Sequence, residues 1–391
     1  MRDKMQTAFD FVKNKLYSKR TSMIYDHIVT DREHEFPVTA DIELVFPNPC
    51  GYASGMEDGM ISGATMLDVC LLRWEKEKCE NSACFAREIV KGMLNCADSA
   101  KSSGFLPRCA ALDDVKMHYP DSSRDQYTMF AFGMHRYINA ELCTHKERER
   151  IAKTAVDIAR RAERNVTQAN GYDMLTDDGG ASLCTVMWGD TLGNHEYMRL
   201  PMLYLFAYEV SGDRHFLEKY KEIREEAYKK SLAMGKYWAM YALGQMQASL
   251  RLCYDVDDED EWRLRYLELM NNVADYADGM TNEIRKKFEA QTGKYNLHQI
   301  SFRDLERLPT ERFSAMGYPK AIALKRPDSQ AYFALQDCAQ LVIITGLTPD
   351  RALNEKVKRL FIDSFEQIDF LLHERNLPIY FLNGYYRTLF K

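Results

Sequence analysis

The sequence has 391 residues, of which 46% are hydrophobic, 28% charged and 12% aromatic, a composition typical of a globular protein with a large core. The net charge of −6 and the isoelectric point near 5.9 argue against a nucleic-acid-binding protein, because phosphate contacts need clustered Lys and Arg. No apolar run reaches the roughly eighteen residues that span a bilayer, and the N-terminal segment has no signal-peptide core. We therefore expect a cytoplasmic protein with no membrane partner.

The ten cysteines form no C-x-x-C pair, and most of them lie in apolar helical patterns. Free buried thiols are the predicted state. The chain contains no H-E-x-x-H motif and no Cys/His spacing typical of zinc. Gly179-Gly180 lacks the Lys and Ser/Thr of a phosphate-binding loop. We therefore expect neither a metal nor a cofactor.

Two kinds of helical segment alternate along the chain. In one kind, small and apolar residues cover nearly every side of the helix, which is typical of a buried helix. These segments are 54–72, 125–142, 196–210, 237–254 and 329–345. In the other kind, charged residues occupy one side, which is typical of a helix at the surface. These segments are 3–18, 81–100, 145–167, 213–230, 258–287 and 349–373.

Two rings of helices account for this alternation, because an inner ring is contacted on every side and an outer ring buries only one side. We therefore predict an all-α fold, a single (α/α)6 toroid that spans residues 1–391. The aromatic tail 377–391 would supply the sixth inner element. The segments that lead into the inner helices are often long and rich in Gly, Pro and Asp. The functional site is therefore expected at the N-terminal ends of the inner helices.

Acidic residues occur at three of these helix entrances. They are Glu57 and Asp58, then Asp125, then Asp190. Glycoside hydrolysis needs a protonated acid for the leaving oxygen and a second carboxylate that activates water or attacks carbon. The competing interpretation is helix capping, because Ser54 and Ser122 each precede an entrance and have the spacing of an N-cap.

The motifs Gly-Met-Glu-Asp-Gly at 55–59 and Ser-Arg-Asp-Gln-Tyr at 123–127, with the alternating helices, resemble the six-hairpin glycoside hydrolases. The resemblance is to the unsaturated uronyl and rhamnogalacturonyl hydrolases and to β-glucuronidase-type families. In the unsaturated uronyl hydrolases, paired aspartates at such positions handle protonation and water activation, and aromatic residues stack on the sugar. The resemblance implies that Asp58 and Asp125 are the pair, with Glu57 as an alternative to Asp58. It also implies an oligosaccharide substrate that contains uronic acid.

Asp125 is the first candidate for general acid/base, and Asp58, Glu57 or Asp190 would raise one pKa by like-charge repulsion if they lie close. A uronate carboxylate calls for a bidentate Arg, and sugar rings stack on aromatic residues in polar loops. The candidate substrate-binding residues are Arg124, Gln126, His118, Tyr119, Tyr127, Trp188, His195 and Arg199, with Arg312 as a further arginine. Surface salt bridges and core packing are the competing interpretations for the arginines and the aromatic residues.

The first functional hypothesis is therefore a hydrolase of oligosaccharides that contain uronic acid. The second is a sugar epimerase or polysaccharide lyase on the same scaffold, with His118, His195 or His298 as proton carriers. The third is a binding protein without catalysis. The aromatic residues at 385–390 are a candidate contact surface for a homo-oligomer.

Overall fold

The computed structural model describes residues 1–29, 33–182, 184–233, 239–295, 297, 301–304 and 329–390. Within these ranges the regular structure is helical, and β-pairing is limited to isolated bridges, Tyr17 with Ile24, His27 with Arg375 and Asp173 with Val186. The predicted all-α class is confirmed. None of the helices in these ranges is both long and apolar enough to cross a bilayer.

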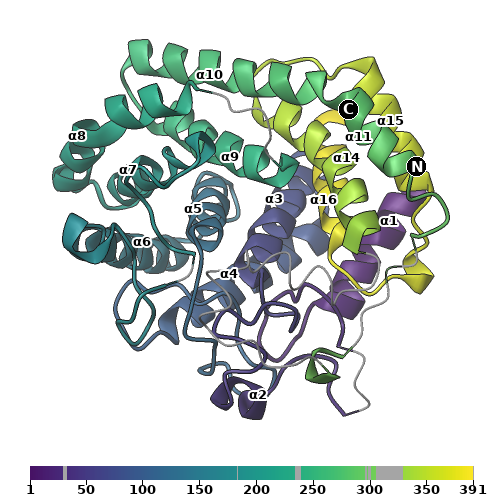
Figure 1. Ribbon diagram of the computed structural model, residues 1–391, viewed down its shortest axis with the longest axis horizontal. Coiled ribbons are helices and arrows are strands. Elements are labelled where there is room, and N and C mark those ends of the chain that lie inside the picture. The colour runs from purple at the N-terminus through teal and green to yellow at the C-terminus, as the bar shows by residue number, and fades with distance from the viewer. Residues whose placement is uncertain are drawn as a thin grey trace.

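The almost wholly apolar segments form the inner helices. They are α3 (Gly59–Glu77), α5 (Arg124–Ile138), α7 (Arg199–Ser211), α9 (Met240–Val256), α14 (Ser329–Leu347) and α16 (Leu377–Gly384). Each contacts the next in chain order, and α16 contacts α3, so these six helices of the described chain close into a ring (Figure 1). The tail segment therefore supplies an inner element, as its apolar sequence predicts.

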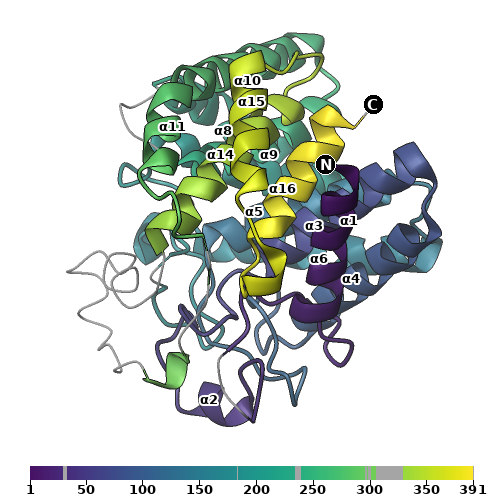
Figure 2. The same ribbon diagram turned by 90° about the vertical axis from the view of Figure 1, so that its right-hand side faces the viewer.

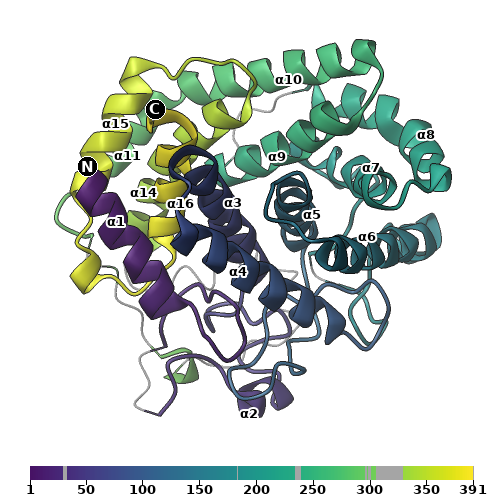
Figure 3. The same cartoon turned by 180° about the vertical axis from the view of Figure 1, so that it is seen from behind.

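The charged segments pack around this ring, as Figure 3 shows from behind. They form α1 (Arg2–Phe11), α4 (Glu80–Asp98), α6 (His145–Asn165), α8 (Arg214–Ser231), α10 (Asp260–Gly279), α11 (Thr281–Glu289) and α15 (Glu355–Glu366). In α6 the buried residues fall on one side, from Ile151 to Ala162, whereas the other side is charged and solvated.

Shorter elements occupy the connections. They are η1 (Val12–Leu16), α2 (Thr39–Glu43), η2 (Gln168–Asn170), η3 (Asn194–Glu196), η4 (Phe302–Asp304), η5 (Phe370–Leu372) and η6 (Tyr385–Leu389). Figure 2 shows α2 and the long connecting segments together on one side of the helices. Tyr385 and Tyr386 are buried against the chain's own core, so these two rings do not offer the contact surface expected at 385–390.

The predicted serine caps are also wrong. The N-cap of α3 is Asp58 and that of α5 is Ser123. Ser54 and Ser122 are buried ahead of the helices, where their hydroxyls donate to the carbonyls of Gly51 and Leu106 at 2.5 and 2.6 Å. The two serine hydroxyls therefore bind loop carbonyls and do not cap the N–H groups of the helices.

Helices α3 and α5 approach closely at Gly133, where an added Cβ would lie 2.9 Å from the Cβ of Ala64. We expect Gly133→Ala to lower the free energy of unfolding by about 1–3 kcal/mol in urea denaturation, because the contact between α3 and α5 has no space for a methyl group. Gly279→Ala is the control, since an added Cβ there would meet no atom of the described residues within 4 Å outside its own helix backbone and chain neighbours. A Gly133→Ala protein as stable as the wild type would contradict this view of the contact.

Candidate functional site

A cavity of about 230 Å³ lies among the inner helices. Its wall is built from the starts of α3 and α5, from α9 and α14, and from the chain around α16. The carboxyl groups that line it are those of Asp26, Glu57, Asp58, Asp68 and Asp125. The entrances of the first two inner helices thus contribute to one cavity, as the ring predicts.

Asp125 lies in the first turn of α5, with its side chain 29% exposed, and pairs with the guanidinium of Arg199, which is 2% exposed. Burial on its own would raise the pKa of Asp125. The charge of Arg199 and its hydrogen bond, followed by the charges of Arg124 and Arg108, outweigh burial and lower the pKa. Asp125 therefore remains ionised at neutral pH.

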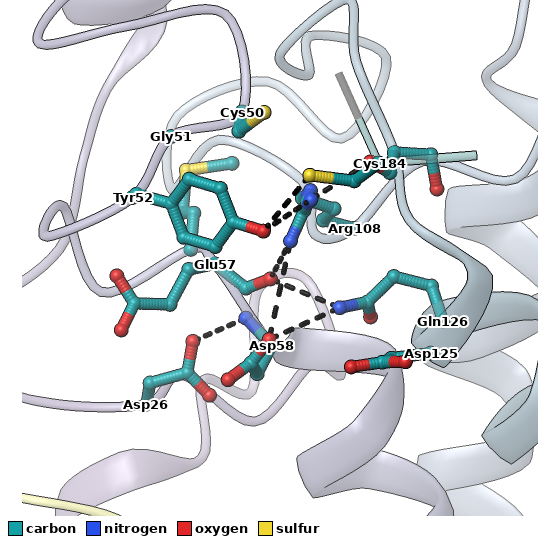
Figure 4. A network of polar contacts seen from close by, with 12 residues as sticks. Asp26, Cys50, Gly51, Tyr52, Glu57, Asp58, Arg108, Asp125, Gln126 and Cys184 are labelled. Atoms are coloured by element: carbon teal, nitrogen blue, oxygen red, sulfur yellow. Dashed lines mark hydrogen bonds and ion pairs between the residues drawn. The ribbon is translucent and has the colours of Figure 1, made fainter. Parts of the chain in front are cut away.

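Asp26, Glu57 and Asp58 form the acid cluster, in which each carboxylate offers an oxygen within 4.8 Å of the others. Asp26 is buried and accepts a hydrogen bond from the Asp58 backbone N–H at 2.5 Å (Figure 4). It accepts a second from the Ser62 hydroxyl at 2.8 Å. Burial raises the pKa of Asp26 well above its usual value, and the charges of Asp58 and Glu57 raise it further. The acid cluster therefore retains a proton.

Neighbouring side chains hold Asp58 at the cavity. The Gln126 amide donates to Asp58 Oδ1 at 3.2 Å and to the Glu57 carbonyl at 3.0 Å (Figure 4). Arg108 donates to the same carbonyl at 2.8 Å, and its Nη1 lies 4.0 Å from Asp58 Oδ1. The side chain of Asp58 is 37% exposed, whereas the Glu57 carboxylate is buried and accepts from the Ala53 N–H. Asp58 is thus the more accessible acid of the Glu57-Asp58 pair.

The structure does not bring Asp190 or Trp188 to the cavity. The Asp190 side chain is 99% exposed and pairs with Lys230 at 3.2 Å. The Trp188 ring packs edge-on against Tyr197, with the Lys230 ammonium 5.9 Å from its centroid. The third helix entrance therefore supplies Arg199 to the site, through its pair with Asp125, and not an acid.

His118, Tyr119 and Tyr127 are buried supports of the loops and do not line the cavity. His118 contacts Asp177 at 3.1 Å, Tyr119 donates to the Phe46 carbonyl at 2.5 Å, and the Tyr127 hydroxyl accepts from the Leu106 N–H at 3.2 Å. Their polar atoms are satisfied inside the protein, which leaves them no role toward a ligand.

The remaining candidates lie beside the acids. Arg124 pairs with Glu196 at 2.7 Å, so neither it nor Arg199 is available to a substrate carboxylate without breaking an ion pair. His195 lies on η3 outside the cavity lining, and burial lowers its pKa. Arg312 and His298 lie outside the described residues.

Several cavity residues were not singled out from the sequence. They are Asp26, Tyr241, Gln245, Tyr332, Gln340 and Arg375. The Arg375 guanidinium lies 3.8 Å from the ring centroid of Tyr332. The sequence could have indicated Gln245 and Gln340, because each is a polar residue within an almost wholly apolar helix. Asp26 lies in an irregular segment with no motif, so only the folded chain brings it to Asp58.

The acid cluster also has the oxygen donors that Ca²⁺ and Mg²⁺ prefer. Protein groups already donate to all three carboxylates: Ser62 to Asp26, the Ala53 N–H to Glu57 and Gln126 to Asp58. These hydrogen bonds are compatible with a cluster that shares a proton, and the three carboxylates do not require a cation.

No family model matches the sequence, and no curated protein shows significant similarity to it. The chemistry of the site therefore has to come from its own geometry.

Asp125→Asn removes the anionic partner of buried Arg199. The pKa of Asp125 is lower in the folded than in the unfolded state. The ion pair therefore contributes its full stability above the pKa of the unfolded state, and this contribution is lost as pH falls through the pKa of the folded state. We expect the variant to be less stable by roughly 2 kcal/mol near neutral pH. The difference should shrink below about pH 4 in urea denaturation. Asp190→Asn, at an exposed position, should show no such trend, and a pH-independent loss in Asp125→Asn would contradict the assignment.

Proposed function

We propose that the protein is a glycoside hydrolase that acts on oligosaccharides containing uronic acid. The observation that supports this best is that Asp58 and Asp125 line one cavity in opposite electrostatic surroundings. Arg199 keeps Asp125 ionised, whereas Asp58 lies beside Asp26, whose pKa is raised by burial and by the charges of Asp58 and Glu57. Carboxyl groups whose surroundings separate their protonation states are the usual acid and base of glycosidases.

In this mechanism the proton held at Asp26 passes to Asp58, which donates it to the glycosidic oxygen as the bond to the anomeric carbon breaks. Asp125 either takes a proton from the attacking water or attacks the carbon itself, depending on the separation of the two carboxyl groups in the complex. Gln126 and Arg108 fix the orientation of Asp58, and Arg199 fixes that of Asp125. Positioned carboxyl groups of this kind accelerate proton transfer by about 100- to 10,000-fold.

Arg375 is the residue we assign to the uronate carboxylate. It is 3% exposed, lines the cavity, and has its guanidinium carbon over the Tyr332 ring. A planar guanidinium in a fixed orientation suits bidentate contact with a carboxylate. Arg387 also lines the cavity, but it pairs with Asp68. We choose Arg375 for its place in the cavity wall and for its contact with the Tyr332 ring.

The epimerase or lyase alternative needs a side chain that abstracts a proton from carbon. His118 is enclosed with Asp177, and His195 lies outside the cavity lining. Tyr241 lines the cavity, but burial and then the charge of Asp125 raise the pKa of its phenol, which keeps it protonated at neutral pH. The carboxylate pair therefore gives hydrolysis the stronger support.

The first experiment measures hydrolysis of chromogenic glycosides and unsaturated uronyl disaccharides by the wild type, Asp58→Asn, Asp125→Asn and Asp190→Asn. We expect the first two variants to lose roughly 1,000-fold in kcat/KM on a uronide, because each removes a proton carrier. Asp190→Asn is the matched control, since its side chain is exposed outside the cavity, and should hydrolyse like the wild type. Hydrolysis undiminished in Asp125→Asn, or no turnover by the wild type on the whole panel, would overturn the proposal.

A second experiment tests the substrate class. Arg375→Met should lower kcat/KM for a glucuronide by roughly 10- to 100-fold, the value of a charged hydrogen bond, and change the matching glucoside less than about threefold. The carboxylate is the difference between the two substrates. An equal loss on both would assign Arg375 a purely structural role against Tyr332.

A further inference from the structure

Two glutamines lie in the cavity wall formed by α9 and α14, which pack against each other. Gln245 of α9 is 5% exposed, and its Oε1 receives no hydrogen bond within the described part of the chain. A buried amide oxygen left without a donor costs about 1–3 kcal/mol, so such an atom in a cavity wall calls for a ligand.

Gln340 of α14 packs against Gly244, the residue that precedes Gln245 on α9, and both glutamines line the cavity. An added Cβ at Gly244 would lie 2.5 Å from Gln340 Oε1. Gly244 also lines the cavity. The absence of a side chain at Gly244 thus lets the Gln340 amide lie across the contact between the two helices.

Tyr332, Gln336 and Gln340 recur every four residues, so they lie on one side of α14, and all three line the cavity. The Tyr332 hydroxyl donates to Asn376 Oδ1 at 2.8 Å, and the Asn376 amide donates to Asp26 at 3.2 Å. The polar stripe of α14 therefore reaches from Gln340 to the acid cluster.

We infer that Gln245 and Gln340 form a hydroxyl-binding subsite that holds the sugar ring beside Asp58 and Asp125. This inference rests on the proposed function. An amide offers both an acceptor and donors, and a sugar hydroxyl both donates and accepts. A carboxylate has no proton to give to Gln245 Oε1, so this subsite takes the hydroxyls and leaves the carboxylate to Arg375. Phe132 and Ile343 line the same cavity and match the C–H surface of a sugar ring.

The test is binding, which needs no turnover. Isothermal titration with D-glucuronic acid and D-galacturonic acid compares the wild type with Gln245→Leu. We expect Kd for the better-bound sugar to rise about tenfold, the loss of one buried hydrogen bond. Gln247→Leu is the matched control: it lies two residues along α9, and its amide donates to the Met270 carbonyl and to Thr348 at 2.9 Å, outside the cavity lining. This control should lower Tm and leave Kd unchanged.

Gly244→Ala provides a variant that keeps every amide. Its new methyl displaces the flexible end of Gln340, so sugar binding should weaken several-fold while Tm is maintained. Unchanged Kd in both Gln245→Leu and Gly244→Ala, equal weakening in Gln247→Leu, or no binding of either sugar by the wild type would overturn the subsite. Binding without hydrolysis would overturn the hydrolase proposal and leave the subsite standing. Hydrolysis of a uronide with unaltered Kd in the variants would overturn the subsite and leave the hydrolase proposal standing.

Discussion

A helix that is packed on every side can hold unpaired charge only near its ends, and this constraint places the chemistry of the protein. Asp58 is the N-cap of α3 and Asp125 lies in the first turn of α5, where free N–H groups and the helix dipole favour carboxylates. Asp68, in the middle of α3, is tolerated because Arg136 and Arg387 pair with it. The closed ring then brings the two helix starts to one cavity.

The partner of each buried carboxyl decides its protonation. Asp125 faces the buried guanidinium of Arg199, whose charge outweighs desolvation and keeps the carboxylate ionised. The donors to the Asp26 carboxyl among the described residues are neutral, namely the Asp58 N–H, Ser62 and Asn376. These neutral donors do not offset the burial of Asp26 or the repulsion from the charges of Asp58 and Glu57, so a proton stays in the acid cluster. A protonated Asp26 and an ionised Asp125 at one cavity follow from this difference.

The all-α class and the inner and outer positions of the helices could be predicted from the sequence, because burial on all sides or on one side is a property of composition. The placement of Asp58 and Asp125 at one cavity followed from the ring. Details of long loops did not follow from periodicity, which is why Ser54, Ser122 and Asp190 were misplaced. Asp26 meets Asn376 across 350 residues of chain, so only closure of the ring creates that contact.

The same constraint explains why the polar groups of the cavity wall change along its length. From Asp58 to Asp68 the lining residues of α3 advance by ten positions, or about 15 Å of helix, away from the charged ends. Over this length α9 and α14 offer amides, which carry polarity into an apolar interior at lower desolvation cost than charges do. An amide there still has to be paired, and Gln245 Oε1 has no donor among the described residues. The proposed hydroxyl-binding subsite would satisfy that oxygen, which a ligand bound only beside Asp58 and Asp125 would leave unpaired.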